Sequence, residues 1–346
     1  MEGGERHTAA VCIASGEVFV CGDNQFGQIA KAIEDECSEG SEDMLYPNLE
    51  RVPELLGIVA VSCGRYHTIC LDYGGKMWSF GRNTHGQLGV GDTTHRYSPV
   101  CVPNMPEISV LSCGYSHNLC IDTNNNLWVF GENNNGQLGT GDLQYRKIPE
   151  VIPDINNAAS VDSGGRYSFI ETTEGKFYCC GRNSEGQLGI GSRETKVKTF
   201  TLFPSPLGGE DIRTIACGFA HTIILTSRGT VYATGHNSGG QLGMGDLTDR
   251  VSPERVSNLP EIRSVHVGYE RTMCVDVEGN LWVCGSNEGR DLGMSSLSLS
   301  VQYEFVKNDN FDCVQAVSRG ADHCFVKDKN GTWAFGVSMF GQLGVG

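Results

Sequence analysis

The chain has 346 residues, of which 39% are hydrophobic and 19% charged, and its formal net charge at pH 7 is -15. An acidic balance argues against direct binding to nucleic acid or to an anionic membrane surface, since both require a basic face. The N-terminal segment MEGGERHTAA lacks the apolar core of a signal peptide, and no run of 18 apolar residues is present to span a membrane. We therefore expect an intracellular protein, cytoplasmic in preference to nuclear.

Short apolar stretches follow one another from the start of the chain. HTAAVCIA and VFVCG come first, and residues 58–103 then contain four stretches: IVAVSCG, HTICLD, KMWSFG and SPVCVP. Their β-branched and aromatic content predicts strands. Gly-Gly and similar pairs between the second and third stretches predict tight hairpins. Prolines recur in the fourth stretch, which predicts an outer edge strand. These prolines are Pro53, Pro99, Pro149 and Pro253.

A GQLG motif repeats along the chain. Copies start at Gly27, Gly86, Gly136, Gly186, Gly240, Gly289 and Gly341, and the first and sixth copies are weak. Seven repeats of about 50 residues, each with four strand-like stretches, predict an all-β fold, a seven-bladed β-propeller of mostly four-stranded antiparallel blades. We expect one domain over residues 1–346. Since the first and fourth stretches occur only six times each, we expect about 26 strands and a depleted closing blade.

An acidic insertion lengthens the first repeat over residues 32–50. It holds the candidate docking residues Glu34, Asp35, Glu36, Glu42 and Asp43. Like-charged runs are usually solvated loops, and the alternative is a docking loop for a basic partner.

Histidine, cysteine and tryptophan recur at fixed repeat positions. The histidines His7, His67, His117, His221 and His323 share one position, which Tyr167 and Arg271 take in the other repeats. Equivalent positions in different blades diverge around a ring, so a repeated hydrogen bond is favoured over a metal site. Cysteines exchange with Val, Ile and Phe and are interpreted as buried small hydrophobes, with Cys37 as the one exposed thiol. The repeated tryptophans are interpreted as packing between blades.

The GQLGVGD loop from Gly86 has the glycines of a phosphate-binding loop but no following Gly-Lys-Ser/Thr. Because it recurs in every repeat, its glycines are assigned to a tight turn. Asp92, Asp142 and Asp246 are expected to cap backbone N–H groups there. We predict no catalytic residue, no metal ligand and no cofactor.

The turn between the first two stretches of each repeat varies while its surroundings repeat. Variable residues on loops of a rigid scaffold are where binding specificity resides, and aromatic residues and arginines anchor interfaces. The predicted partner-binding residues are Arg65, Tyr66, Tyr115, Ser116, Arg166, Phe219, Tyr269, Glu270 and Asp322. We expect them on one propeller face, and the alternative is that some of them only cap the channel.

The patterns C/S-G-x-x-H-x-x-x-L and W-x-F/C-G-x-N-x-x-G-Q-L-G-x-G-D resemble the regulator of chromosome condensation repeat over essentially the whole chain. The founding member of that family is a nucleotide exchange factor for the small GTPase Ran and acts from chromatin. The resemblance implies that acidic and histidine residues on the turn face take part, and Asp322-His323 matches that pairing. Tyr66, Ser116, Arg166 and Glu270 do not match it well, and the repeat intervals leave little room for that protein's wedge-like insertion.

Two functions follow as hypotheses. The first is a protein-interaction propeller that regulates or scaffolds small-GTPase signalling, within a longer chain or alone. The second is a guanine nucleotide exchange factor for a Ran- or Rho-like small GTPase. Neither requires bond-making chemistry, and a shared fold does not choose between them. We expect a protein partner, with no direct nucleic-acid contact and no membrane insertion.

Overall fold

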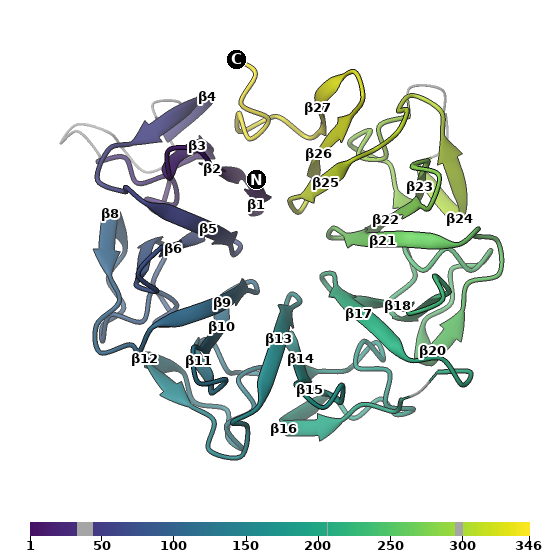
Figure 1. The fold of residues 1–346 in the computed structure, drawn as a ribbon, viewed down its shortest axis with the longest axis horizontal. Coiled ribbons are helices and arrows are strands. Elements are labelled where there is room, and N and C mark those ends of the chain that lie inside the picture. The colour runs from purple at the N-terminus through teal and green to yellow at the C-terminus, as the bar shows by residue number, and fades with distance from the viewer. Residues whose placement is uncertain (33–43, 206, 295–299) are drawn as a thin grey trace.

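The computed structural model describes residues 1–32, 44–205, 207–294 and 300–346, which form a ring of seven antiparallel sheets around a central axis (Figure 1). Blade 1 contains β1 (Glu2–Gly3), β2 (His7–Cys12), β3 (Glu17–Asp23) and β4 (Leu45–Val52). Blade 2 contains β5 (Ile58–Cys63), β6 (His67–Asp72), β7 (Met77–Gly81) and β8 (Arg96–Cys101). Blade 3 contains β9 (Ile108–Cys113), β10 (His117–Asp122), β11 (Leu127–Gly131) and β12 (Arg146–Val151).

The remaining blades follow the same order from the axis outward. Blade 4 contains β13 (Ala158–Ser163), β14 (Tyr167–Thr172), β15 (Phe177–Arg182) and β16 (Lys196–Leu202). Blade 5 contains β17 (Ile212–Cys217), β18 (His221–Thr226), β19 (Val231–Gly235) and β20 (Arg250–Arg255). Blade 6 contains β21 (Ile262–Val267), β22 (Arg271–Asp276), β23 (Leu281–Ser286) and β24 (Val301–Asn308). Blade 7 contains β25 (Ala316–Arg319), β26 (His323–Asp328) and β27 (Gly331–Gly336).

The described residues thus contain 27 strands, one more than the sequence count, and the seven-bladed all-β architecture is confirmed. Blade 7 has three strands, as expected for a depleted closing blade. Blade 1 is complete because Glu2–Gly3 pairs with residues 8–9 of β2, a two-residue strand that carries no apolar pattern. The proline of β4 is Pro47, whereas Pro53 lies just beyond that strand. None of the described segments is a helix long and apolar enough to cross a membrane.

The hairpins between the second and third strands form because one residue in each accepts a positive φ. Gly75 has φ +75° and Asn125 has φ +65° at this point. In blade 2, the Asp72 carboxylate accepts the N–H groups of Gly74 and Lys76, both at 2.9 Å. Gly and Asn tolerate this conformation, and Asp stabilises it with side-chain acceptors.

The core consists of apolar clusters between neighbouring blades. Six clusters join blades 1–2, 2–3, 3–4, 4–5, 5–6 and 6–7. Half-buried Trp78, Trp128 and Trp282 pack against three of them, which confirms the prediction for these tryptophans. Across the described residues at the seam between blades 7 and 1, no cluster of this kind is found. That seam is joined by hydrogen bonds from Ala321 N–H to Gly4 C=O and from Gly346 N–H to Pro47 C=O.

The GQLG loops bind each blade to the next. Gly86 has φ +75°, and a Cβ there would lie 2.5 Å from the Lys147 Cα of the following blade. Gly91 N–H donates to Lys147 C=O at 2.9 Å. Asp92 accepts the Thr94 N–H at 3.0 Å, and Asp142 and Asp246 do the same in their blades, so the capping prediction is confirmed. The GQLG motif therefore forms contacts and hydrogen bonds that connect neighbouring blades.

Three predictions about the first repeat are either wrong or concern residues outside the described part of the chain. The insertion predicted over residues 32–50 ends earlier, because residues from Leu45 onward belong to β4. Glu34, Asp35, Glu36, Glu42 and Asp43 lie outside the described residues, as does Cys37. The prediction that Cys37 is the one exposed thiol is wrong, since Cys12, Cys101 and Cys313 are exposed. Cys12 and Cys101 are the last residues of β2 and β8, and Cys313 lies in the loop before β25.

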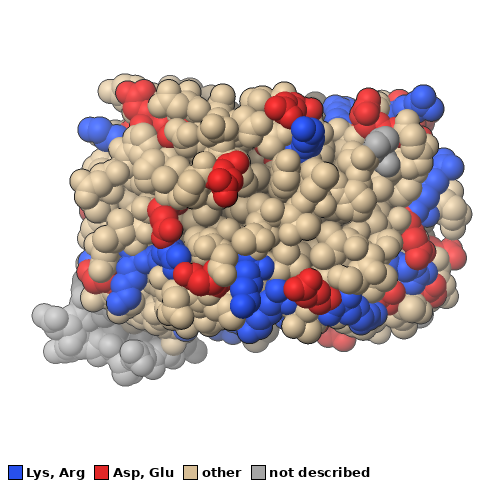
Figure 2. Space-filling view, turned by 90° about the horizontal axis from the view of Figure 1, so that it is seen from below, with Lys and Arg blue, Asp and Glu red and all other residues tan. Residues whose placement is uncertain are grey.

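Charged side chains on the visible rim lie beside partners of opposite sign, gathered mainly along one edge (Figure 2). Arg146 pairs with both Asp142 and Glu150, and Arg250 pairs with both Asp246 and Glu254. The arginines of these outer strands are therefore neutralised locally.

Candidate interaction face at the propeller axis

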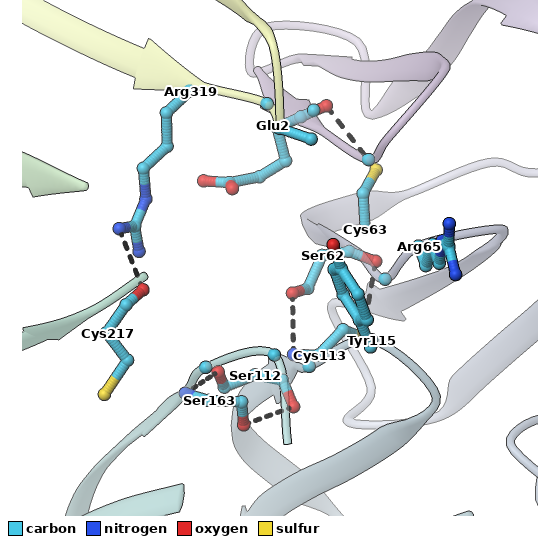
Figure 3. A pocket seen from close by; sticks show the side chains of 18 of the residues that line it. Glu2, Ser62, Cys63, Arg65, Ser112, Cys113, Tyr115, Ser163, Cys217 and Arg319 are labelled. Atoms are coloured by element: carbon cyan, nitrogen blue, oxygen red, sulfur yellow. Dashed lines mark hydrogen bonds between the residues drawn. The ribbon is translucent and has the colours of Figure 1, made fainter. Parts of the chain in front are cut away.

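The first strands of the blades surround a cavity of about 290 Å³ on the propeller axis (Figure 3). Glu2, Asp162 and Arg319 project into it, and Arg319 Nη2 lies 3.8 Å from Asp162 Oδ1. Desolvation raises the pKa of Glu2 and of Asp162, and the nearby Arg319 partly offsets that rise. Cys63 and Cys217 also line the cavity, and burial raises the pKa of both thiols.

Three aromatic rings converge at one mouth of this cavity, and we call Tyr115, Phe219 and Tyr269 the aromatic cap. Phe219 and Tyr269 stack with ring centroids 4.2 Å apart and an interplanar angle of 9°. The Tyr115 centroid lies 5.1 Å from that of Phe219 and 6.1 Å from that of Tyr269. The rings come from blades 3, 5 and 6, so the propeller brings together side chains that are distant in sequence. All three are partly exposed.

Arginines extend this aromatic surface over blades 1 and 2. The Arg65 guanidinium lies 5.1 Å from the Tyr115 centroid and 5.0 Å from the Tyr66 centroid. Glu5 binds Arg65, raises its pKa above the ordinary value, and accepts the Tyr66 hydroxyl at 2.9 Å. Further out, Arg82 lies 5.0 Å from the Phe26 ring. Stacked guanidinium and aromatic groups are strong interface anchors when a partner desolvates them.

The nine residues predicted to bind a partner separate into three groups. Arg65, Tyr115, Phe219 and Tyr269 line the cavity mouth and touch one another in a chain. Tyr66 and Ser116 are buried, with exposed fractions of 8% and 9%, so they support the face from below. The other three, Arg166, Glu270 and Asp322, are partly exposed.

The repeated histidines hold the blades in register beneath this face. His67 Nε2 lies 2.8 Å from Asn118 Oδ1 of the next blade, and Asn118 Nδ2 donates to Gln87 C=O of the GQLG loop. Equivalent contacts of 2.7 to 3.1 Å join His7 to Thr68, His117 to Ser168, His221 to Thr272 and His323 to Thr8. Each hydroxyl donates to a loop carbonyl, so the histidine Nε2 must carry the proton. The predicted hydrogen-bond role is confirmed.

The histidines are neutral because they are buried. Burial lowers the pKa of His7, His117, His221 and His323 to about 3, and that of His67 to about 4. Among the residues that the structure describes, no three His, Cys, Asp or Glu side chains are grouped to hold a metal ion.

At the seam between blades 6 and 7, three residues of this hydrogen-bond pattern are replaced. Arg271 replaces the histidine, Asp291 replaces the loop glutamine, and Cys324 replaces the next blade's acceptor. Arg271 Nη2 donates to His323 C=O at 2.9 Å, and both Arg271 and Asp291 are buried. In the same loop, Arg290 occupies the position of the first GQLG glycine with φ +58°, so the sixth copy starts one residue later than its sequence suggested.

The regulator of chromosome condensation (RCC1) repeat is the family whose sequence profile matches this chain, at residues 15–71, 74–121, 124–170, 174–225 and 228–275. These matches cover more than half of the chain. The chain belongs to the RCC1-repeat family.

Curated relatives share short parts of this RCC1-repeat chain. The human probable E3 ubiquitin-protein ligase HERC6 is 35% identical over 88 residues, which is 25% of this chain and 8% of the relative. The dog X-linked retinitis pigmentosa GTPase regulator is 32% identical over 93 residues, or 27% of this chain and 8% of the relative. The matched segments thus span less than a tenth of these two relatives.

Solved structures match over nearly the full ring. Human WBSCR16 has a TM-score of 0.82 at 20% identity, covering 95% of this chain and 90% of its own. Prp20p of Saccharomyces cerevisiae, described with its binding to Gsp1p and histones, has a TM-score of 0.79 at 19% identity, covering 98% and 82%. At this identity the likeness shows the RCC1-repeat propeller fold.

Two features of this RCC1-repeat propeller were not predicted from the sequence. The aromatic cap was predicted as separate turn residues, and only the ring geometry shows that Tyr115, Phe219 and Tyr269 meet. The Arg271–Asp291 pair could have been predicted, because both residues replace the usual repeat residue in the same repeat and their charges are opposite.

Proposed function

We propose that this chain is a protein-interaction propeller whose turn face binds a protein partner, with the aromatic cap as the central anchor. The convergence of Tyr115, Phe219 and Tyr269 at the axis carries this proposal. Aromatic side chains near the centre of an interface dominate binding energy, since they bury a large area with few rotatable bonds. The ring below is rigid, so little conformational entropy is lost when a partner binds.

The surroundings of the cap suit a protein partner. Arg65 and Arg82 stack on aromatic rings on one side of the face. Glu270 and Asp322 supply carboxylates in blades 6 and 7. A central apolar anchor surrounded by charged groups is the usual anatomy of a protein interface.

The proposal is tested by comparing wild-type chain with Phe219→Ala and Tyr115→Ala variants as affinity baits in an extract, with bound proteins quantified by mass spectrometry. Tyr73→Ala is the matched control, because Tyr73 is 85% exposed in the hairpin at the far end of β6 from the turn face. Partners of the face are retained by the control and lost from both cap variants. A partner set that is identical for all four baits contradicts the proposal.

A second candidate function is guanine nucleotide exchange. In that case the protein partner is a small GTPase. Asp322 is partly buried on the turn face directly before His323, and desolvation raises its pKa. One curated relative is named as a GTPase regulator, and the solved Prp20p is described as binding Gsp1p. Loss of a fluorescent guanine nucleotide from a panel of small GTPases measures this function. Acceleration by the wild type and not by Asp322→Asn supports it, and no acceleration at micromolar chain eliminates it.

We also propose that the protein works in a reducing, intracellular compartment. All 14 cysteines of the described residues are free thiols. Thiols persist where cellular reductants keep them reduced. Fractionation of cells that express the tagged full-length protein tests this location.

A further inference from the structure

Three arginines surround the buried ring of Tyr66 on the turn face, and we call Arg6, Arg65 and Arg82 the arginine patch. Their guanidinium carbons lie 6.0, 5.0 and 5.7 Å from the Tyr66 ring centroid. Tyr66 is 8% exposed, whereas the three arginines are partly exposed. Arg65 also lies 5.1 Å from the Tyr115 centroid, so the patch is continuous with the aromatic cap (Figure 3).

The position of Arg82 is a variable one in the repeat. It follows the glycine of the third strand and, in six repeats, precedes an asparagine. The residues at this position are Asp23, Arg82, Glu132, Arg182, His236, Ser286 and Val337. The Arg82 N–H donates to Tyr66 C=O at 2.8 Å, so its backbone is fixed beside the patch. Variable residues that a rigid scaffold holds in place are where binding specificity resides.

The carboxylates of the chain do not balance the charge of the patch. Among the described residues, Glu5 is the one carboxylate within ion-pair distance: it binds Arg65 and lies 3.9 Å from Arg6. Asp23 is buried and accepts the Gln25 N–H. Desolvation raises the pKa of Asp23, and that N–H group and the charge of Arg6 oppose the rise. Three cations therefore share one contacting carboxylate.

Arg82 is the cation of the patch without a counterion. It donates to the Thr84 hydroxyl at 3.2 Å, and it forms no ion pair within the part of the chain that the structure describes. The rim arginines differ, because Arg146 and Arg250 each pair with two carboxylates. An arginine that is held in place but lacks a carboxylate is suited to accept one from outside the chain.

Aromatic rings hold the arginines in an orientation that suits a carboxylate. The guanidinium of Arg6 lies 4.2 Å from the Phe340 ring centroid, and that of Arg82 lies 5.0 Å from the Phe26 ring centroid. Stacking on a ring leaves the N–H donors at the edge of the guanidinium plane, where a carboxylate accepts two of them in parallel. Because the side chains are already held, less rotamer freedom is lost when a ligand binds.

The charge of the whole chain limits the size of the ligand. The formal net charge is -15, so an extended polyanion such as a nucleic acid is repelled wherever it passes beyond the patch. A short run of carboxylates gains the contacts with the arginines and avoids most of this repulsion. The ligand that fits is therefore a short acidic stretch of a protein.

We propose that the arginine patch binds a short acidic segment of the partner protein, next to an apolar side chain of the same partner on the aromatic cap. This inference rests on the proposed function and specifies the chemistry of the partner. Arg6 and Arg82 donate hydrogen bonds to the partner's carboxylates. Arg65 remains paired with Glu5 and joins the patch to the cap.

A fluorescein-labelled peptide of sequence GSFDEDEG tests the patch in the full chain by fluorescence polarisation. The control peptide, GSFNQNQG, replaces each carboxylate with the amide of the same shape. The acidic peptide is expected to bind, and the amide peptide to bind at least about 10-fold more weakly, because hydrogen bonds to charged groups are the strong ones. Equal binding of the two peptides, or no binding of the acidic one, overturns the proposal.

An arginine variant locates the binding. Arg82→Ala is expected to weaken binding of the acidic peptide about 10-fold, since one charged contact is lost. Arg228→Ala is the matched control. Arg228 is exposed in the hairpin between β18 and β19, at the far end of β18 from the turn face, and forms no ion pair among the described residues. Equal affinity of the Arg82→Ala chain and the wild type contradicts the proposal.

Arginine footprinting of the wild-type chain keeps the test independent of how that variant folds. Phenylglyoxal modifies accessible guanidinium groups, and mass spectrometry measures the rate at each site. The acidic peptide is expected to slow the modification of Arg6 and Arg82 and to leave that of Arg228 unchanged. Rates at Arg6 and Arg82 that do not change with the peptide overturn the proposal.

Two other occupants of the patch have outcomes of their own. A single-stranded oligonucleotide that displaces the peptide and binds more tightly overturns the proposal, because the patch then recognises phosphate. Peptide binding that occurs only after the chain's own acidic residues Glu34, Asp35, Glu36, Glu42 and Asp43 are changed to amides also overturns it. In that case the chain itself supplies the occupant.

The affinity baits separate a failure of this inference from a failure of the proposed function. Partners that are lost from Phe219→Ala and retained by Arg82→Ala contradict the role of the patch and leave the proposed function standing. Partners that are retained by both variants contradict both. Loss from both variants, with retention by Arg228→Ala, supports both.

Discussion

The guanidinium of Arg271 lies 3.4 Å from the carboxylate of Asp291, and both side chains are buried near the seam between blades 6 and 7. In the other six blades the second position holds a glutamine, and the first holds a buried neutral histidine in all of them except blade 4, which has Tyr167. Desolvation raises the pKa of Asp291, whereas the charge of Arg271 opposes that rise. Removing one partner of such a pair leaves the other as an uncompensated buried charge, which destabilises the fold.

Asp291→Asn is therefore expected to lower the free energy of unfolding by about 3 kcal/mol, since it leaves Arg271 buried without its counterion. Denaturant titration measures this loss. The triple variant Arg271→His, Asp291→Gln and Cys324→Thr recreates the seam of the other blades and is expected to recover most of it. A triple variant as unstable as the single one contradicts this account.

Arg290 provides a test of backbone strain in the same loop. Its φ is +58°, where the equivalent residue of most other loops is glycine. Arg290→Gly is expected to stabilise the fold by about 0.5–1 kcal/mol. The reverse change, Gly240→Arg, is expected to destabilise it by more, because a Cβ there lies 2.8 Å from the Tyr303 Cα. Equal effects of the two changes would show that φ and close approach are unimportant at this position.

The buried histidines predict acid sensitivity. Each has a folded pKa of about 3 or 4 and an ordinary value near 6.5, so the unfolded chain binds protons first as pH falls. Their contribution is fully present above about pH 6.5 and is lost as the pH falls toward the folded pKa. Buried carboxyls with raised pKa, such as that of Asp162, act in the opposite direction.

Comparison with a variant isolates the histidine effect from the carboxyl effect. His117→Gln is expected to make the loss of unfolding free energy between pH 7.5 and 5.5 smaller by about 1 kcal/mol. Denaturant titrations at both pH values measure it. The same pH dependence in variant and wild type would mean that His117 is already protonated in the fold or exposed to solvent.

The closure seam is expected to open before the others. Hydrogen bonds such as that from Thr8 Oγ1 to Gln342 C=O at 2.7 Å join blades 1 and 7, whereas apolar clusters join the other neighbours. Regions with few buried apolar contacts exchange their amides through low-energy openings. Hydrogen exchange should therefore be faster in β2 and β26 than in β10 and β14. Uniform rates in the four strands contradict this expectation.

The features of the fold that recur with the repeat could be predicted from the sequence, and those that depend on contacts between distant blades could not. The hairpin turns, the histidine hydrogen bonds and the capping role of Asp92 follow from local patterns that recur in several blades. β1 was missed because a strand of two residues, Glu2–Gly3, has no periodicity, and its pairing depends on the neighbouring strand. The aromatic cap was predicted only as variable turns, because the meeting of Phe219 with Tyr115 depends on the ring's diameter and closure.

The central claim is that the turn face binds a protein partner through the aromatic cap. The most direct measurement is the affinity of a recovered partner for wild-type, Phe219→Ala and Tyr73→Ala chains of equal melting temperature, by isothermal titration calorimetry. We predict a loss of about 2 kcal/mol or more for Phe219→Ala, in the range of interface hot spots, and no loss for Tyr73→Ala. A partner that binds all three chains with equal affinity would contradict the claim.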